Sequence, residues 1–336
     1  MTVAILDLDW IRYAAGFVGE KREIQTIHKS TGDVRTFKNV TEFYGRGKAK
    51  NKGWIGEWNT SNPDSPVAFE DFDILEIQKP EPIANVLHTA KSMVENSLKA
   101  VNADSYIAYY GRGDSFRVER STIIKYKGNR EHLKKPLLLP EITEYLEKKF
   151  GAIPCEGLEA DDWCIISAYR KKDHVVISPD KDTGGCDVIW CNPNNDYKPV
   201  DCSGFGSLWI EEKTAANGRV DKTVRGVGQK FFLFQVAVGD SIDNYSANSA
   251  SSIEWGDISG YNALKDSTNF KEALEATVNV YKHLYPEPVE VEGWRGDIIT
   301  VDWKSAFAEN FDLARMLRWE DDKVDPIEVL RKYGIE

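Results

Sequence analysis

Short apolar runs alternate with longer amphipathic stretches along most of the chain. Residues 3–9 (VAILDLD), 105–110 (SYIAYY), 174–178 (HVVIS) and 187–191 (DVIWC) have the length and composition of short buried strands. Between the first two, residues 83–101 place apolar side chains at helical spacing. Strands that alternate with helices predict a parallel sheet in an α/β domain.

Three later stretches, at 140–150, 157–172 and 225–245, also have helical patterns. The second begins with acidic residues and ends in Arg170, Lys171 and Lys172, which is the charge order that the helix dipole favours. The expected chain therefore continues as alternating strands and helices into a helical C-terminal part.

Residues 20–80 interrupt this order. They alternate only weakly between apolar and polar positions and carry a turn signal at 31–33 (TGD), so we interpret them as an inserted, hairpin-rich segment. We expect an α/β catalytic domain over 1–225 that includes this insertion, and a helical C-terminal region over 226–336 with a DNA-binding turn and closing helices.

The net charge of −11 is unusual for a protein that binds nucleic acid, because phosphate contacts need Lys and Arg. The basic residues are nevertheless concentrated in two places. Residues 117–136 contain seven Lys or Arg against two Glu, and residues 46–53 contain four basic residues and no acid. This distribution favours a protein that contacts phosphates locally and repels them elsewhere.

The cysteines and the hydropathy pattern limit the class of protein. The five cysteines are odd in number and have neither paired CxxC spacing nor a downstream His pair, so we expect reduced structural thiols rather than a zinc site. No charged leader precedes a long apolar run, and no stretch approaches the roughly 20 apolar residues of a membrane span. We expect a cytoplasmic monomer, in the host cytoplasm if the chain is phage-encoded.

Acidic residues recur at the ends of five predicted elements. In parallel sheets, ligands bind where the strands present their carboxyl ends, so acids on separate strands can converge in one crevice. The five clusters are Asp7 with Asp9; Asp114; Glu159 with Asp161 and Asp162; Asp180 with Asp182; and Asp240 with Asp243.

Carboxylates at close range need cations between them. Oxygen ligands without His or Cys favour Mg²⁺ or Mn²⁺. Each cluster alone also has a structural explanation, because acids in a first helical turn favour the dipole and Asp after a strand often makes a turn. Their joint appearance at five element ends is what indicates a metal site.

One alternative is a phosphatase of the haloacid-dehalogenase-like group, in which two acids end the first strand as Asp7 and Asp9 do here. Residues 239–243 (GDSID) also resemble that group's acidic motif, but Trp10 occupies a position where the pattern has Thr or Val. This alternative leaves the acids of 159–162 and the basic segment 126–130 unexplained.

Four motifs together resemble phage 5′→3′ exonucleases, relatives of flap endonucleases and of the 5′-nuclease domain of bacterial DNA polymerases. They are YKGNR at 126–130, GLEADD at 157–162, SPDKD at 178–182 and GDSIDN at 239–244. They follow the family's order and approximate spacing. Residues 313–318 (LARMLR) are similar to a late helix of short-tailed-phage members.

The resemblance implies a PIN-like α/β fold: a central, mostly parallel sheet flanked by helices, with a helical arch and a helical C-terminal region. It implies two divalent cations, Mg²⁺ or Mn²⁺. The glycine-rich turn that normally follows the last acids is replaced by residues 246–252, so the expectation does not extend to the family's K⁺ site.

Site residues carry over position by position. The first-metal group falls on Asp7, Glu159, Asp161 and Asp162, and the second on Asp180, Asp182, Asp240 and Asp243, with Asp114 as a further candidate. The catalytic cations of the arch fall on Lys127 and Arg130. The expected DNA contacts are Arg117, Tyr126, Lys134, Lys135, Arg46, Lys48 and Lys50.

The implied activity is a metal-dependent 5′→3′ exonuclease and 5′ flap endonuclease that cuts DNA by a two-metal mechanism in phage DNA replication, recombination or host DNA breakdown. Its partners would be duplex 5′ ends and flaps, and RNA–DNA hybrids are further candidate substrates. A PIN-like protein that binds nucleic acid without catalysis is the remaining alternative.

Overall fold

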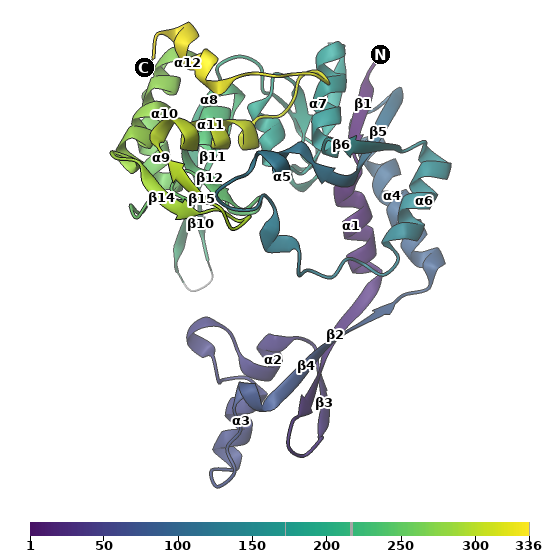
Figure 1. The fold of residues 1–336 in the computed structure, drawn as a ribbon. Helices are drawn as coiled ribbons and strands as arrows, with labels where there is room; N and C mark the ends of the chain where they lie inside the picture. Colours follow the sequence, from purple (N-terminus) through teal and green to yellow (C-terminus); the bar gives the residue numbers. More distant parts are fainter. Residues whose placement is uncertain (172, 216–217, 336) are drawn as a thin grey trace. The chain divides into compact units, whose positions relative to one another are not determined.

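The computed structural model describes residues 1–171, 173–215 and 218–335, and the chain forms two compact units (Figure 1). One comprises Met1–Ile11, Met93–Lys134 and Glu147–Glu336, and the other comprises Arg12–Ser92 and Lys135–Leu146. All five cysteines are free thiols, as expected. Among the described helices, none combines the length and the apolar character that a membrane crossing would need.

A six-stranded sheet in the order β6-β5-β1-β7-β8-β9 forms the centre of the larger unit. All neighbouring strands are parallel except the pair β8–β9. β1 has partners on both sides, and its Ala4, Ile5 and Leu6 are accordingly buried. The strands are β1 (Val3–Asp7), β5 (Ser105–Ser115), β6 (Ile153–Gly157), β7 (His174–Ile177), β8 (Ile189–Cys191) and β9 (Pro199–Asp201).

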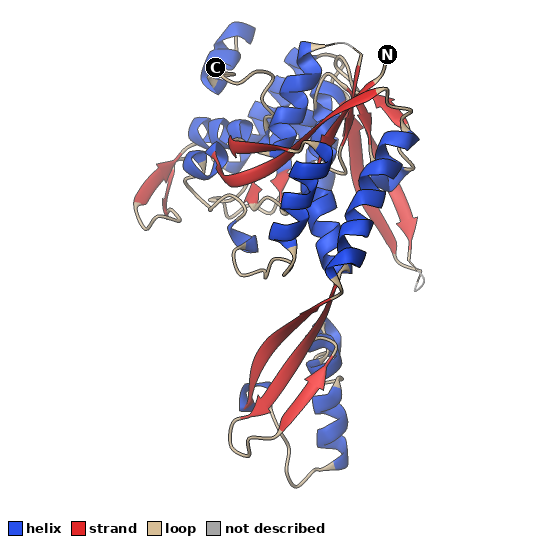
Figure 2. Cartoon of the chain, turned by 90° about the vertical axis from the view of Figure 1, so that its right-hand side faces the viewer, coloured by secondary structure: helices blue, strands red, loops and turns tan. Residues whose placement is uncertain are grey.

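Helices flank this sheet, so the α/β class with a mostly parallel central sheet is confirmed (Figure 2). Helix α7 (Ala160–Arg170) packs on the sheet through Cys164, Ile165 and Ala168, which meet Ile5 and Val176 in one buried cluster. The close packing of α7 against β1 and β7 fixes the first turn of the helix beside the carboxyl ends of these strands.

A second core in the same unit surrounds helix α8, which is apolar on most sides and almost fully buried. Tyr126 and Val224 belong to this core together with Phe234 and Phe307. The elements that follow β9 are β10 (Ser207–Thr214), β11 (Val220–Val227), α8 (Gly228–Val238), β12 (Gly239–Asp240), β13 (Tyr245–Ser246), α9 (Asp257–Leu264), α10 (Phe270–Leu284), β14 (Val289–Glu292), β15 (Ile298–Val301), α11 (Trp303–Ala314) and α12 (Pro326–Tyr333).

This shared core corrects the expected domain boundary. The sheet and residues 226–336 belong to one compact unit, so the chain does not divide at residue 225. The C-terminal part is also less helical than expected, because it includes the β12–β13 and β14–β15 hairpins.

The expected helical arch is also wrong. Between α5 (Phe116–Arg120) and α6 (Leu139–Phe150) the chain is a loop with one short 3-10 turn at Gly128–Arg130. Lys127 has a φ of 55°, in the left-handed region that an α-helix does not use. Pro136, which cannot donate a helical hydrogen bond, follows before α6.

The smaller unit is built on a three-stranded antiparallel sheet in the order β3-β2-β4. Its core is a cluster of Ile24, Phe43, Ile55 and Phe72. The unit also includes most of α1 and the first parts of α4 and α6. Its elements are α1 (Asp9–Val18), β2 (Glu20–His28), β3 (Val34–Phe37), α2 (Val40–Tyr44), a 3-10 turn (Gly47–Ala49), α3 (Trp54–Ser61), a second 3-10 turn (Phe69–Asp71), β4 (Phe72–Pro80) and α4 (Ile83–Ala100).

Candidate metal centre

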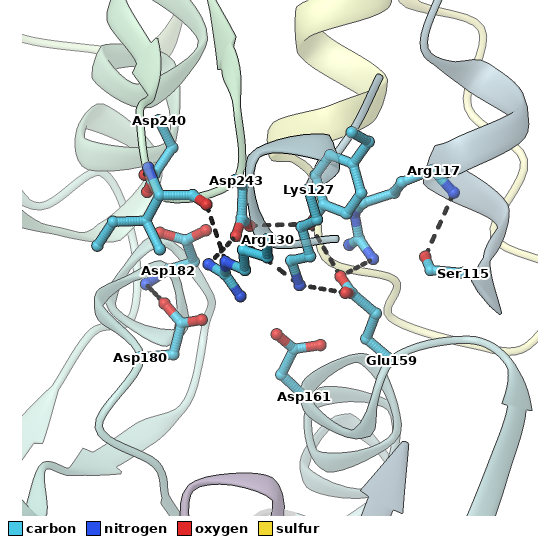
Figure 3. A network of polar contacts seen from close by, with 12 residues as sticks. Ser115, Arg117, Lys127, Arg130, Glu159, Asp161, Asp180, Asp182, Asp240 and Asp243 are labelled. Carbon is cyan, nitrogen blue, oxygen red and sulfur yellow. Dashed lines mark hydrogen bonds and ion pairs between the residues drawn. The ribbon is translucent and has the colours of Figure 1, made fainter. Parts of the chain in front are cut away.

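The larger unit gathers carboxylates around the carboxyl ends of β1 and β7 (Figure 3). Asp7 is the last residue of β1, and Asp180 lies just after β7, its neighbour in the sheet. Asp161 lies in the first turn of α7, and Asp240 and Asp243 follow α8. These positions meet because parallel neighbouring strands end on the same side of the sheet.

Burial and repulsion between carboxylates raise the pKa values of four acids in this cluster: Asp7, Asp161, Asp180 and Asp182. Burial, with Asp9 and Asp180 nearby, raises the pKa of Asp7 to about 7. Burial is also the first cause that raises the pKa of Asp180, and it raises the pKa values of Asp161 and Asp182 well above the ordinary value. In each case neighbouring carboxylates add to the effect, so the cluster carries more negative charge than its surroundings neutralise.

Asp7→Asn should therefore raise the melting temperature of the metal-free protein, and the gain should increase with pH. The folded protein keeps a proton on Asp7 up to a pH of about 7, whereas the ordinary pKa in the unfolded chain is 3.8. Between these values the folded state binds more protons, so the contribution of this group to stability falls as the pH rises.

Asparagine at position 7 does not titrate, so the variant does not lose this stability as the pH rises. Melting curves in EDTA at about pH 5 and about pH 8 measure the difference from wild type, which should be several degrees larger at the higher pH. Asp64→Asn changes an exposed carboxylate of the smaller unit and should have little effect at either pH. A gain that does not depend on pH would contradict the expected titration of Asp7.

Arg117 is buried beside the first acid group. Its Nη1 donates to Asp162 Oδ2 at 2.7 Å and its Nη2 donates to Asp162 Oδ1 at 2.8 Å. Nη1 also donates to Glu159 Oε2 at 3.0 Å, while Nε and Nη2 bond the carbonyls of Leu313 and Arg315. The expected DNA contact by Arg117 is wrong, because only 2% of the residue is exposed and the guanidinium is fully engaged.

The same contacts separate the roles of the two aspartates in α7. Both oxygens of Asp162 accept hydrogen bonds from Arg117, and Oδ1 also accepts from the backbone N–H of Leu317. Asp161 pairs with no described cation, and its Oδ1 accepts only from the backbone of Asp162. Asp161 is therefore the better candidate for a direct metal ligand, and Asp162 positions Arg117.

Tyr126 connects the two acid groups instead of facing solvent. Its hydroxyl lies 2.9 Å from Glu159 Oε2 and 2.8 Å from Asp243 Oδ2, so it can donate to either carboxylate. Burial and the charge of Glu159 hold the pKa of Tyr126 well above its ordinary value, so it remains a donor. The expected DNA contact is wrong for Tyr126 as well, because only 3% of the residue is exposed.

Lys127 and Arg130 also lie against the acids (Figure 3). Lys127 Nζ pairs with Glu159 and lies 3.8 Å from Asp243 Oδ1, and Arg130 Nη2 donates to the same Asp243 oxygen at 2.9 Å. Burial alone would lower the pKa of Lys127, but the carboxylates of Glu159 and Asp243 raise it overall. Conversely, Lys127 and Arg117 outweigh burial and lower the pKa of Glu159.

Backbone contacts hold this basic segment in place. The N–H of Lys127 donates to the carbonyl of Asp243 at 2.9 Å, and Arg130 Nε donates to the carbonyl of Ile242 at 3.1 Å. The amides of Asn129 and Asn244 add two further bonds between residues 125–130 and 241–244. The YKGNR and GDSIDN motifs are therefore parts of one structure.

The remaining acids are held by uncharged donors and by one lysine. Gln235 of α8 donates to Asp182, Ser178 donates to Asp7 at 3.1 Å, and Lys181 pairs with Asp240 at 3.0 Å. Gly239 permits this arrangement: its φ is +91°, and a Cβ there would lie 2.3 Å from Ser246 Cα. Only glycine fits this close approach of β12 and β13.

The structure brings together the eight expected ligands other than Asp114. Asp114 is exposed within β5, and no described contact joins it to the cluster. The expected strand ends at residue 110, before Asp114, but β5 continues to Ser115 because it pairs with β6. The acid that contacts β5 here is Asp9 and not Asp114. The two carboxylate oxygens of Asp9 accept the N–H of Gly111 at 3.0 Å and 3.2 Å.

Three supporting residues were not expected from the sequence: Ser178, Lys181 and Gln235. Asp9 was expected within the first acidic cluster, but it was not assigned to either metal group. Ser178 and Lys181 lie within the SPDKD motif at 178–182, whereas no sequence signal distinguishes Gln235 within its helix. Of the remaining expected DNA contacts, Arg46, Lys50, Lys134 and Lys135 are exposed, and the side chain of Lys48 lies outside the described part of the chain.

The donor set fits hard divalent cations. One oxygen from each of Glu159, Asp161 and Asp162 lies within 4.8 Å of the others. The buried Asp7 and the half-buried Asp180 add carboxylates with raised pKa values. Sites made only of carboxylate oxygens suit Mg²⁺ or Mn²⁺. A bound dication would also compensate the repulsion that raises these pKa values.

Comparison with known proteins adds little to this description. No protein-family model matches the chain, and no curated protein matches it. Among solved structures, the chain is similar to the T5 D15 protein, co-crystallised with metal ions, with 18% sequence identity and a TM-score of 0.43. The alignment covers 74% of this chain and 90% of that one.

Proposed function

We propose that this protein is a divalent-metal-dependent nuclease that hydrolyses DNA phosphodiesters as a 5′→3′ exonuclease and 5′ flap endonuclease. The observation that supports this proposal most is the set of buried and half-buried carboxylates that repel one another, with Lys127 and Arg130 at its edge. Poorly neutralised acids suit divalent cations, and such cations can also bind the oxygens of an anionic substrate. The nearby Lys and Arg suit the same anionic substrate.

In this proposal the carboxylates divide into two holding groups. Asp7, Asp161 and Glu159 would hold one ion, and Asp180, Asp182, Asp240 and Asp243 a second. When bound, such ions lower the pKa of a coordinated water and stabilise the attacking and leaving oxygens of an in-line displacement.

The protein's own cations have a separate task. Lys127 and Arg130 now pair with Glu159 and Asp243, and the phosphate would take over these contacts as cations neutralise the acids. Both side chains would then stabilise the negative charge that builds on the phosphate in the transition state. Tyr126 and Arg117 keep Glu159 oriented, because each of them bonds its Oε2 atom.

The polarity of cleavage tests the proposed activity. Purified protein with Mg²⁺ should release short labelled products from a 5′-labelled duplex and from a 5′ flap. A 3′-labelled strand should be shortened progressively without early loss of its label, and an RNA–DNA hybrid in the same series defines how RNA is treated. Hydrolysis of a small phosphomonoester with no cut in any DNA would indicate the phosphatase alternative instead.

A further inference from the structure

The smaller unit contains an aromatic hollow that the metal centre does not use. A cavity of about 310 Å³ opens between the three-stranded sheet and α3. Its walls include His28, Arg35, Trp54, Trp58 and Phe72. Trp54 and Trp58 are both half-buried, and their ring centroids lie 5.4 Å apart. Aromatic faces of this kind are the surfaces on which unpaired bases stack.

Arg35 presents an unneutralised charge at this hollow. Its guanidinium carbon lies 4.8 Å from the ring centre of Trp54 and 5.5 Å from that of Trp58. No described carboxylate forms an ion pair with it, although Asp33 also lines the cavity. An Arg stacked on aromatic rings keeps its planar set of donors available, and this geometry suits a phosphate group.

Other basic residues of the smaller unit differ in whether they pair with acids. On the strands β2 and β4, Lys21 and Lys79 pair with Glu23, and Arg22 pairs with Glu20. In contrast, Arg46, Lys50 and Lys52 are exposed and form no ion pair within the described residues. These three residues lie just before α3, whose first residue is Trp54. These unpaired cations therefore belong to the same unit as the aromatic hollow, and they come just before the helix that supplies its two tryptophans.

We propose that the smaller unit is a binding module for single-stranded nucleic acid. One unpaired base enters the hollow and stacks on Trp58, Arg35 contacts an adjacent phosphate, and the loop of residues 46–52 follows the backbone. The combination of ring faces and unpaired cations matches the two features that single strands offer, exposed bases and regularly spaced phosphates. This binding needs neither metal nor cleavage, so it stands apart from the proposed nuclease activity.

Fluorescence anisotropy in EDTA tests the proposal with a labelled oligo(dT) of about twelve nucleotides, within the usual site size for single-strand binders. Arg35→Gln and Trp58→Ala should each weaken binding about tenfold, the order of one lost stacking or charged contact. Wild type should also prefer the single strand to a duplex of the same length. Arg35→Gln changes an exposed side chain, so its result does not depend on whether Trp58→Ala folds normally.

Two double variants with the same change in net charge give the matched control. Lys50→Gln with Lys52→Gln should weaken binding and flatten its salt dependence by about 1.4 units, at roughly 0.7 for each of two phosphate contacts on a single strand. Lys21→Gln with Lys79→Gln removes two exposed lysines that pair with Glu23, and should leave binding within about twofold of wild type. Equal losses in both double variants, wild-type affinity in Arg35→Gln, or equal affinity for duplex and single strand would overturn the proposal.

Discussion

Asp161→Asn should abolish metal-dependent cleavage while the protein remains folded and continues to bind DNA. Asp161 is the acid of the α7 pair without a described cationic partner, so its charge is available to a metal ion. Burial, Glu159 and Asp162 hold the pKa of Asp161 well above its ordinary value, which shows that the charge is unfavourable in the metal-free protein. Removing it should raise the metal-free melting temperature and reduce repulsion of the DNA phosphates.

Asp162→Asn gives the matched control on the neighbouring residue. Among the described residues it leaves the buried Arg117 with only Glu159 as a charged partner, and breaking a buried pair of this kind typically costs about 3–5 kcal/mol of stability. The melting temperature should therefore fall in Asp162→Asn and rise in Asp161→Asn. Cleavage rate, DNA affinity and melting temperature measured on both proteins decide the assignment. Wild-type cleavage by Asp161→Asn, or the same direction of thermal shift in both, would show that the two roles are wrongly assigned.

Lys127→Ala and Arg130→Ala should each lower the single-turnover cleavage rate at saturating DNA by about 10²–10³-fold, the usual loss for a preorganised group that stabilises transition-state charge. The structure adds a stability effect that an exposed helical arch would not show. Lys127 pairs with Glu159, and Arg130 pairs with Asp243, so each variant leaves an acid less neutralised. Metal-free melting temperatures should fall, and added Mg²⁺ should restore more stability to these variants than to wild type.

Lys134→Ala is the control for that pair, because Lys134 is exposed in the same loop. It should weaken DNA binding and flatten its salt dependence by about one unit, with little change in the rate at saturation. Rates near wild type at saturating DNA in Lys127→Ala and Arg130→Ala would show that residues 126–130 only attract DNA and do not act in catalysis. An equal rate loss in all three variants would lead to the same conclusion.

The convergence of the acids could be predicted because it follows from local rules. Asp7 and Asp180 each follow an apolar run that reads as a buried strand, and neighbouring parallel strands place such residues side by side. The Glu159 to Asp162 group is similarly fixed by the start of a helix whose apolar face packs on the sheet. Each of these patterns involves only a few adjacent residues, so it can be recognised in a single sequence.

The contacts of the basic residues could not be predicted, because they depend on partners far away in the sequence. Arg117 looks like part of an exposed basic island, yet it bonds Asp162, 45 positions away, and the carbonyl of Arg315, 198 positions away. Tyr126 looks like an exposed aromatic beside cations, but its hydroxyl reaches Asp243 at a separation of 117. A run of charged residues in the sequence does not show which of them are buried. Burial of a charge depends on the partners that the tertiary structure supplies.

If the carboxylate cluster is a metal centre for phosphodiester hydrolysis, as we propose, cleavage must depend on a divalent cation. A 5′-labelled flapped duplex is incubated with wild-type protein in excess EDTA, and then with Mg²⁺ or Mn²⁺ in excess over the chelator. We expect no cleavage in EDTA and full cleavage with either cation, with Asp161→Asn inactive throughout. Cleavage by wild type that continues undiminished in EDTA, or no cleavage under any metal condition, would contradict the proposal.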